Sequence, residues 1–103
     1  DAGLVTIVSF ISPFRSERRM ARELFDEDSF FEVFVDTPLS VCEERDVKGL
    51  YKRARQGALK NFTGIDSPYE SPERADVHLA TVEATADDSA RRIVELLQEK
   101  QLI

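Results

Sequence analysis

Basic side chains gather in one window, residues 45–60, where their type and spacing suit a multiply charged anion. The window holds six basic residues and one acidic residue, Asp46, whereas the whole chain carries a net charge of −6. Several fixed cations stabilise a phosphate or sulfate group, but a solvated helix face explains the same residues equally well. One helix could present four of them on one face, although Gly49 interrupts it. These four are Arg45, Lys48, Lys52 and Arg55, and Arg53 and Lys60 complete the set.

A second candidate is the pair Ser12 and Pro13, which follows a run of apolar residues. Ligands of parallel sheets bind beyond the carboxyl ends of the strands. Ser12 follows one expected strand and Thr37 follows the next. Both residues are therefore expected at the edge of the sheet where ligands bind. The alternative is structural, with Ser12 as a helix N-cap and Pro13 at the first helical position. The two interpretations are compatible, because a capping residue can border a ligand.

A third candidate is Phe62, which lies in a polar stretch, residues 60–72, that is rich in turn-forming residues. Turn chemistry explains such a loop but not an aromatic ring inside it. The ring either fills a gap in the core, which is the commoner case, or stacks on a flat ligand such as a purine.

The remaining reactive side chains carry weaker signals. His78 is isolated in an expected strand, which favours a structural role, and Cys42 has no histidine partner by spacing, which favours a buried thiol over a nucleophile. No spacing typical of metal ligands is present. A further basic run alternates with glutamates and is most simply a solvated face; its members are Arg15, Arg18, Arg19 and Arg22.

The elements that must position these residues alternate between strands and helices. Apolar stretches predict strands over residues 4–10, 30–36 and 76–81, the first of them buried on both faces. Helices are expected over residues 14–25, from Thr37 as N-cap to about residue 45, and over residues 49–56. The last helix has acidic residues at its start and an apolar stripe of Ala90, Ile93, Val94 and Leu97. This order predicts an α/β fold with a mainly parallel sheet.

Length and composition limit the class of protein. With 103 residues, 42% of them hydrophobic, the chain can build one small core, so we expect a single domain over residues 1–103. No apolar run is long enough to span a bilayer, and the single cysteine fits a reducing, cytoplasmic compartment. An acidic chain with one basic window is a poor candidate for nucleic-acid binding. A small, highly charged anion is the expected ligand.

The first residues, Asp1, Ala2 and Gly3, lead at once into an apolar run. This pattern is typical of a helix end with glycine just beyond it. We therefore expect a helix to precede residue 1 and the chain to be part of a longer one.

Three segments in order resemble the adenylyl-sulfate (APS) kinase family. They are Ser-Phe-Ile-Ser-Pro-Phe at residues 9–14, Phe-Val-Asp-Thr-Pro-Leu at 34–39, and Arg-Asp-Val-Lys-Gly-Leu-Tyr-Lys-Arg-Ala-Arg at 45–55. Phe-Thr-Gly-Ile-Asp at 62–66 and Pro-Tyr-Glu at 68–70 extend the resemblance over essentially the whole chain. The family has a three-layer P-loop kinase fold, of which this chain would be the C-terminal portion. Its members use ATP and Mg²⁺ to phosphorylate the 3′-hydroxyl of adenosine 5′-phosphosulfate (APS), giving PAPS, in sulfate assimilation.

The resemblance implies roles for individual residues that bind APS. By matched position, Ile11 and Ser12 would contact APS, and Lys48 would pair with its phosphosulfate group. Asn61 and Phe62 would border its adenine, with Phe62 as one wall of an aromatic clamp. The family's match to Ser12 is also a possible phosphoserine, although direct in-line transfer requires only positioning and charge neutralisation.

The resemblance implies further roles around ATP and in assembly. Arg45 would lie in a mobile lid over ATP, and the backbone near Ala80 would touch the ATP adenine. A homodimer, and an ATP sulfurylase fused to or associated with the kinase, are expected partners. The other lid residues would be Lys52, Arg53 and Arg55.

The sequence also departs from the family pattern. The Gly-x-x-x-x-Gly-Lys-Ser/Thr phosphate loop does not occur in these residues, and Asn61 stands where the family commonly has glycine. Without that loop little would hold the transferred phosphate, so we expect residues 1–103 alone not to turn over ATP. The alternative function is a non-catalytic regulatory domain of an ATP sulfurylase that binds APS or PAPS. A third, weaker possibility is a kinase of another small hydroxylated substrate, such as gluconate or shikimate.

Overall fold

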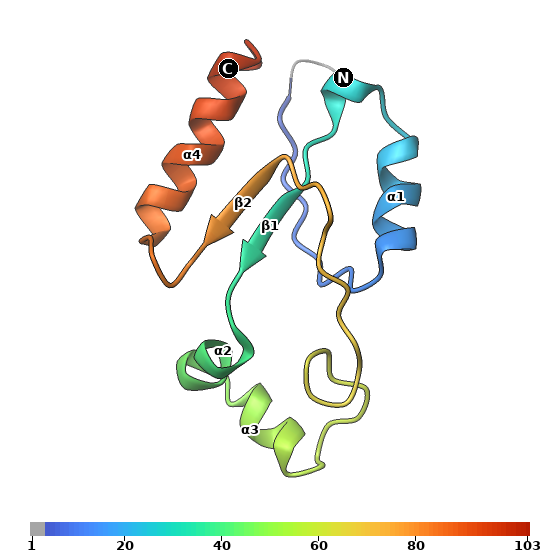
Figure 1. The fold of residues 1–103 in the computed structure, drawn as a ribbon, viewed down its shortest axis with the longest axis vertical. Helices are drawn as coiled ribbons and strands as arrows, with labels where there is room; N and C mark the ends of the chain where they lie inside the picture. The colour runs from blue at the N-terminus through green and yellow to red at the C-terminus, as the bar shows by residue number, and fades with distance from the viewer. Residues whose placement is uncertain (1–3) are drawn as a thin grey trace.

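A computed structural model describes residues 4–103, so the helix end expected at Gly3 lies outside the described residues. The described chain alternates short helices with two strands (Figure 1). The elements in order are α1 (Arg15–Glu23), the 3-10 turn η1 (Glu27–Ser29), β1 (Val33–Asp36), α2 (Leu39–Arg45), α3 (Leu50–Arg55), β2 (Val77–Ala80) and α4 (Ala86–Glu99).

The two strands form a parallel sheet in which Val33 pairs with Val77 and Asp36 with Ala80. The crossover between them contains α2, α3 and a long loop, as a parallel connection requires. Val77 and Leu79 on β2 are 4% and 5% exposed and form the centre of a small core. The predicted α/β class with a parallel sheet is confirmed, and both strands lie within their predicted ranges.

Helix α4 packs along β2 and has the strongest local signals in the chain (Figure 1). The Thr85 side chain accepts a hydrogen bond from the Asp88 amide, and the Asp88 carboxylate accepts one from the Thr85 amide. This capping box satisfies two amides that a helix start leaves without partners. Ile93 and Leu97 are half-buried, whereas Ala90 and Val94 are exposed. The predicted helix is therefore confirmed, with its apolar stripe only partly covered.

The prediction of a doubly buried strand over residues 4–10 is wrong. The segment has no strand pairing, because neither β1 nor β2 donates to it or accepts from it. Its side chains are exposed, with Ile7 at 88% and Phe10 at 82%. β-branched sequence favours an extended backbone, but a strand also needs a neighbour for its amides and carbonyls. The chain exposes 8340 Å², against about 5,900 Å² expected for a compact protein of its mass.

Both predicted N-cap residues have other roles. Ser12 adopts a left-handed conformation (φ 42°), and α1 begins only after Phe14, which provides no side-chain cap. The Glu70 carboxylate accepts a hydrogen bond from the first helical amide, that of Arg15, at 2.7 Å. The Thr37 hydroxyl likewise does not cap α2, since it is hydrogen-bonded to the Thr81 hydroxyl.

The basic run on α1 is not simply the solvated face that its pattern suggests. Arg18 is 11% exposed and ion-pairs with Glu32, and Arg22 pairs with Asp76 at 2.6 Å. These arginines connect α1 to the start of β1 and to the segment before β2. The helix thus depends on ionic contacts where its apolar side chains, such as Met20 at 67% exposure, remain in solvent.

Among residues 4–103, no helix combines the length and the apolar composition required to cross a membrane.

The small core gives a direct test of stability. Leu79→Ala removes a 5% exposed side chain from β2, so we expect it to lower the free energy of unfolding by about 2–5 kcal/mol. Leu24→Ala, at a position that is 79% exposed, should change it by no more than about 0.5 kcal/mol. Urea denaturation followed by circular dichroism measures both, and equal effects would show that β2 does not form the core.

Candidate functional site

The carboxyl ends of β1 and β2 bring together residues that are far apart in the sequence. Thr37 and Thr81 follow the two strands, and their hydroxyls are hydrogen-bonded to each other. Arg45, at the end of α2, donates to the Thr81 hydroxyl and to the Thr81 carbonyl, both at 3.4 Å. Arg45 and the backbone beside Ala80, which we expect to bind ATP, are therefore neighbours. The parallel register explains this, because Asp36 and Ala80 are paired.

The turn between α2 and α3 separates the basic window into two helices. The Asp46 carboxylate accepts hydrogen bonds from the amides of Tyr51 and Lys52 at 3.1 and 3.0 Å, and thereby caps α3. Gly49 takes the left-handed conformation (φ 68°) that this turn requires. The single cationic face considered for one helix is therefore wrong. A glycine that must adopt positive φ cannot continue a helix.

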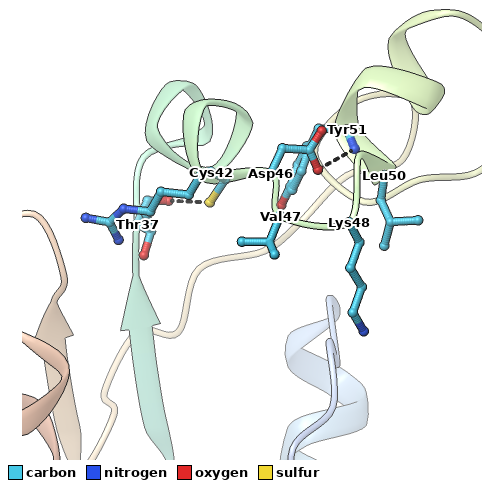
Figure 2. A pocket seen from close by; sticks show the side chains of 8 residues that line it. Thr37, Cys42, Asp46, Val47, Lys48, Leu50 and Tyr51 are labelled. Carbon is cyan, nitrogen blue, oxygen red and sulfur yellow. Dashed lines mark hydrogen bonds between the residues drawn. The ribbon is translucent and has the colours of Figure 1, made fainter.

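An open pocket of about 390 Å³ lies between the end of β1 and this turn (Figure 2). Lys48 extends from the turn away from both helices, and no ion pair or hydrogen bond to its ammonium occurs among residues 4–103. An exposed cation without a carboxylate partner is available for an anion. The lining residues are Thr37, Cys42, Arg45, Asp46, Val47, Lys48, Leu50 and Tyr51.

Tyr51 joins the pocket to the aromatic side chain of the following loop. Its ring meets Phe62 edge to face, with centroids 5.0 Å apart. The pKa of the Tyr51 hydroxyl is raised mainly by burial and, to a smaller extent, by a hydrogen bond with Cys42. The phenol therefore stays neutral at physiological pH. Cys42 itself donates to the Thr37 carbonyl at 3.7 Å. Phe62 is half-buried, which leaves part of its ring free.

The loop around Phe62 is shaped by one carboxylate, that of Asp66. It accepts hydrogen bonds from the amides of Asn61, at 2.8 Å, and Phe62. Asn61 has a positive φ of 56°, which asparagine tolerates better than most residues. The Gly64 amide donates to the Ser67 carbonyl at 2.8 Å and closes the turn. Asn61 and Phe62, the expected adenine neighbours, therefore have a defined backbone.

Ile11 and Ser12 lie on a separate segment. Ile11 is 68% exposed, and the Ser12 carbonyl accepts a hydrogen bond from Arg18 at 2.5 Å. Among residues 4–103, no hydrogen bond joins Ser12 to Lys48 or Phe62. Figure 1 places the turn before α1, the helices α2 and α3 and the loop around residue 62 toward the same end of the sheet.

The expected lid residues on α3 are exposed and only one makes a side-chain ion pair in the described chain. Arg55 donates to the Glu43 carboxylate at 2.6 Å, and this hydrogen bond raises the pKa of Arg55. Lys52 and Arg53 point into solvent. The three side chains do not line the pocket that contains Lys48.

His78 packs on the sheet, as expected for a structural residue. Its ring stacks on Phe34 with centroids 5.1 Å apart, and its Nε2 lies 2.8 Å from the Asp36 carboxylate. Residues 4–103 contain no group of three or more histidine, cysteine, aspartate or glutamate side chains able to hold a metal ion.

Sequence reasoning missed the residues that shape the site through hydrogen bonds. Asp46, three positions before a glycine and just before a helix, was a readable cap signal. Asp66 had the weaker signal of an acidic residue in a turn. The contacts of Thr81 and Glu70 had no local signal, because their partners lie 44 and 55 residues away.

Comparison with known proteins gives matches over most of the chain. The model of the family described as "Adenylylsulphate kinase" matches residues 1–80. The adenylyl-sulfate kinase of Marinobacter nauticus is 53% identical over the whole chain. The bifunctional enzyme CysN/CysC of Xylella fastidiosa is 58% identical over 94% of the chain, which corresponds to 16% of that enzyme.

A solved structure, the Mycobacterium tuberculosis APS kinase CysC in complex with AMPPNP and APS, resembles this fold with a TM-score of 0.79. It is 46% identical in sequence, and the match covers 86% of this chain and 52% of that one. The chain likewise spans 52% of the Marinobacter nauticus kinase. At these levels of identity and coverage the relationship is settled: the chain belongs to the adenylylsulphate kinase family.

Proposed function

We propose that the complete protein transfers the γ-phosphoryl group of ATP to the 3′-hydroxyl of APS, giving ADP and PAPS. The observation that carries this proposal is the position of Lys48. Lys48, whose ammonium has no partner in residues 4–103, lines a pocket at the carboxyl end of β1 together with Arg45 and Tyr51. A phosphosulfate group is a multiply charged anion that such a cation binds.

The proposed APS site extends from Lys48 through Tyr51 to the loop at residue 62. Phe62, which is half-buried and meets Tyr51 edge to face, stacks the exposed part of its ring on the adenine. Asn61 borders the same base through its fixed backbone. Ile11 and Ser12 contact APS from the segment before α1, with Ser12 as a contact residue and not a covalent intermediate.

The proposed ATP site lies at Arg45, Thr81 and Ala80. The guanidinium and the two threonine hydroxyls fit an adenine nucleotide, because they offer donors beside a strand end that is open to ligands. Bound Mg²⁺ would neutralise the charge of the transferred phosphoryl group. It is usually held through nucleotide phosphates and one or two carboxylates.

In the transfer, the 3′-oxygen of APS bonds to the γ-phosphorus as the bond to the β–γ bridging oxygen breaks, and the hydroxyl proton is released. Lys48 fixes the sulfated end of APS while Phe62 fixes the base, so the ribose between them is oriented. Positioning of this kind supplies much of the rate in phosphoryl transfer. Lys52, Arg53 and Arg55 form the exposed surface of a lid over ATP.

We further propose that residues 1–103 are the C-terminal portion of one kinase domain that forms a homodimer. An ATP sulfurylase fused to or associated with the domain would supply APS. Support for fusion comes from the bifunctional CysN/CysC relative, of which the matched segment is 16% of the length. The free thiol of Cys42 fits action in the cytoplasm.

The reaction itself is the first test. The complete protein with γ-labelled ATP and Mg²⁺ should form labelled PAPS when APS is added, and should not phosphorylate gluconate or shikimate. Binding of APS or PAPS without turnover would favour the regulatory domain of a sulfurylase. Neither binding nor turnover would contradict both functions.

Lys48→Ala tests the anion contact. Loss of one charge-assisted hydrogen bond costs about 1.5–3 kcal/mol, so we expect the KM for APS to rise roughly 10- to 100-fold. Lys60→Ala, a control in the same basic window but outside the pocket, should leave it unchanged. Steady-state kinetics at saturating ATP give both values, and a normal KM for the Lys48 variant would remove this residue from the site.

Phe62→Leu separates stacking from core filling, because leucine retains the apolar volume but has no aromatic face. Base stacking contributes about 1–3 kcal/mol, so we expect weaker APS binding in calorimetry with only a small change in Tm. Phe25→Leu, at a ring that packs on Phe30 away from the pocket, is the control. A lowered Tm with unchanged APS affinity would instead assign Phe62 to the core.

A further inference from the structure

Arg18 has contacts that the solvated pattern of α1 does not explain. Its side chain is 11% exposed, and its guanidinium donates to the carbonyls of Ser12 and Glu70, each at 2.5 Å. Its Nε lies 3.6 Å from the Glu32 carboxylate, and its guanidinium carbon lies 5.6 Å from the centre of the Tyr69 ring. One arginine therefore joins three segments of the chain.

The segment that Arg18 holds has a conformation that needs support. Ser12 has φ 42°, in the left-handed region that is unfavourable for a residue with a side chain. Such residues persist where their surroundings over-determine them, and they cluster at ligand clamps. The carbonyl of this strained residue is the one that Arg18 binds.

Glu70 holds the same segment through two further hydrogen bonds. Its amide donates to the Pro13 carbonyl at 2.7 Å, and its carboxylate accepts from the Arg15 amide at 2.7 Å. Arg18 in turn donates to the Glu70 carbonyl. Arg18 and Glu70 are therefore hydrogen-bonded both to each other and to residues 12–15. The Ser12 carbonyl and the Pro13 carbonyl each accept one of these hydrogen bonds. Ile11, next to them, is 68% exposed and therefore accessible to a ligand.

We propose that Arg18, together with Glu70, is a positioning residue that fixes Ile11 and Ser12 for APS. This inference rests on the proposed function, since it assigns to that segment the APS contacts proposed above. Arg18 does not touch APS itself. A guanidinium fork can bridge two carbonyls in a fixed geometry, whereas a lysine ammonium can do so only loosely.

The control for this proposal lies one turn along the same helix. Arg22 also joins α1 to a distant segment, through Asp76 at 2.6 Å and the Phe30 ring, but within residues 4–103 it has no hydrogen bond, ion pair or cation–π contact with residues 11–15. Loss of Arg22 should therefore loosen the helix without moving the Ser12 segment.

The test compares Arg18→Ala, Arg18→Lys and Arg22→Ala in the complete protein. For Arg18→Ala we expect the KM for APS to rise about tenfold or more, with the KM for ATP within about twofold, because two charge-assisted hydrogen bonds are lost. Arg18→Lys should recover part of this loss. Arg22→Ala should leave both KM values within about twofold. A purely structural role would lower the active fraction, and hence kcat, without separating the two KM values.

Hydrogen–deuterium exchange supplies a readout that does not need activity. Amides of residues 11–15 should exchange faster in Arg18→Ala than in the wild type, and at the wild-type rate in Arg22→Ala. An unchanged KM for APS, equal rises in both KM values, or the same response in Arg22→Ala would overturn the proposal. If the wild-type protein does not use APS, the proposed function fails, while exchange still shows whether Arg18 holds this segment.

Discussion

The parallel pairing of β1 with β2 is the constraint on which the rest of the molecule depends. The register from Val33–Val77 to Asp36–Ala80 places two strand ends side by side although more than forty residues separate them in the chain. Thr37 and Thr81 become neighbours for that reason, and Arg45 reaches Thr81 because α2 starts at the same end. These three residues come together because the two short strands are parallel and end at the same edge of the sheet.

Hydrogen bonds between side chains and the backbone fix the conformation of segments that have few buried apolar side chains. Within residues 4–103 only Ala54, Val77 and Leu79 are buried, each 4–7% exposed. The segments around the pocket are shaped instead by carboxylates that bind amides, Asp46 at the start of α3 and Asp66 in the following loop. Each such bond contributes about 1.5–3 kcal/mol when one partner is charged. They define the backbone of turns that contain few apolar side chains.

Much of the fold could be predicted from the sequence, and the failures have identifiable causes. Local signals located α4, β1, β2 and the break at Gly49 correctly. The strand expected over residues 4–10 failed because periodicity reports the preference of a segment and not the presence of a partner. The prediction of Thr37 as a cap failed because its hydroxyl is hydrogen-bonded to the hydroxyl of Thr81, at the end of the neighbouring strand. Of the candidate site, Lys48 and Arg45 line one pocket, whereas Ile11 and Ser12 lie on a segment of their own.

The sequence by itself determined the family, the α/β class and the elements with short-range signals, because caps, turns and apolar stripes involve residues only a few positions apart. The tertiary structure alone decided which polar groups meet over long separations. Arg15 and Glu70 lie 55 residues apart, and Arg18 and Glu70 lie 52 apart. No spacing rule connects such positions, since their contact depends on the path of the whole intervening chain. Because of that path, Arg18, which belongs to a basic run typical of a solvated face, donates a hydrogen bond to the Ser12 carbonyl.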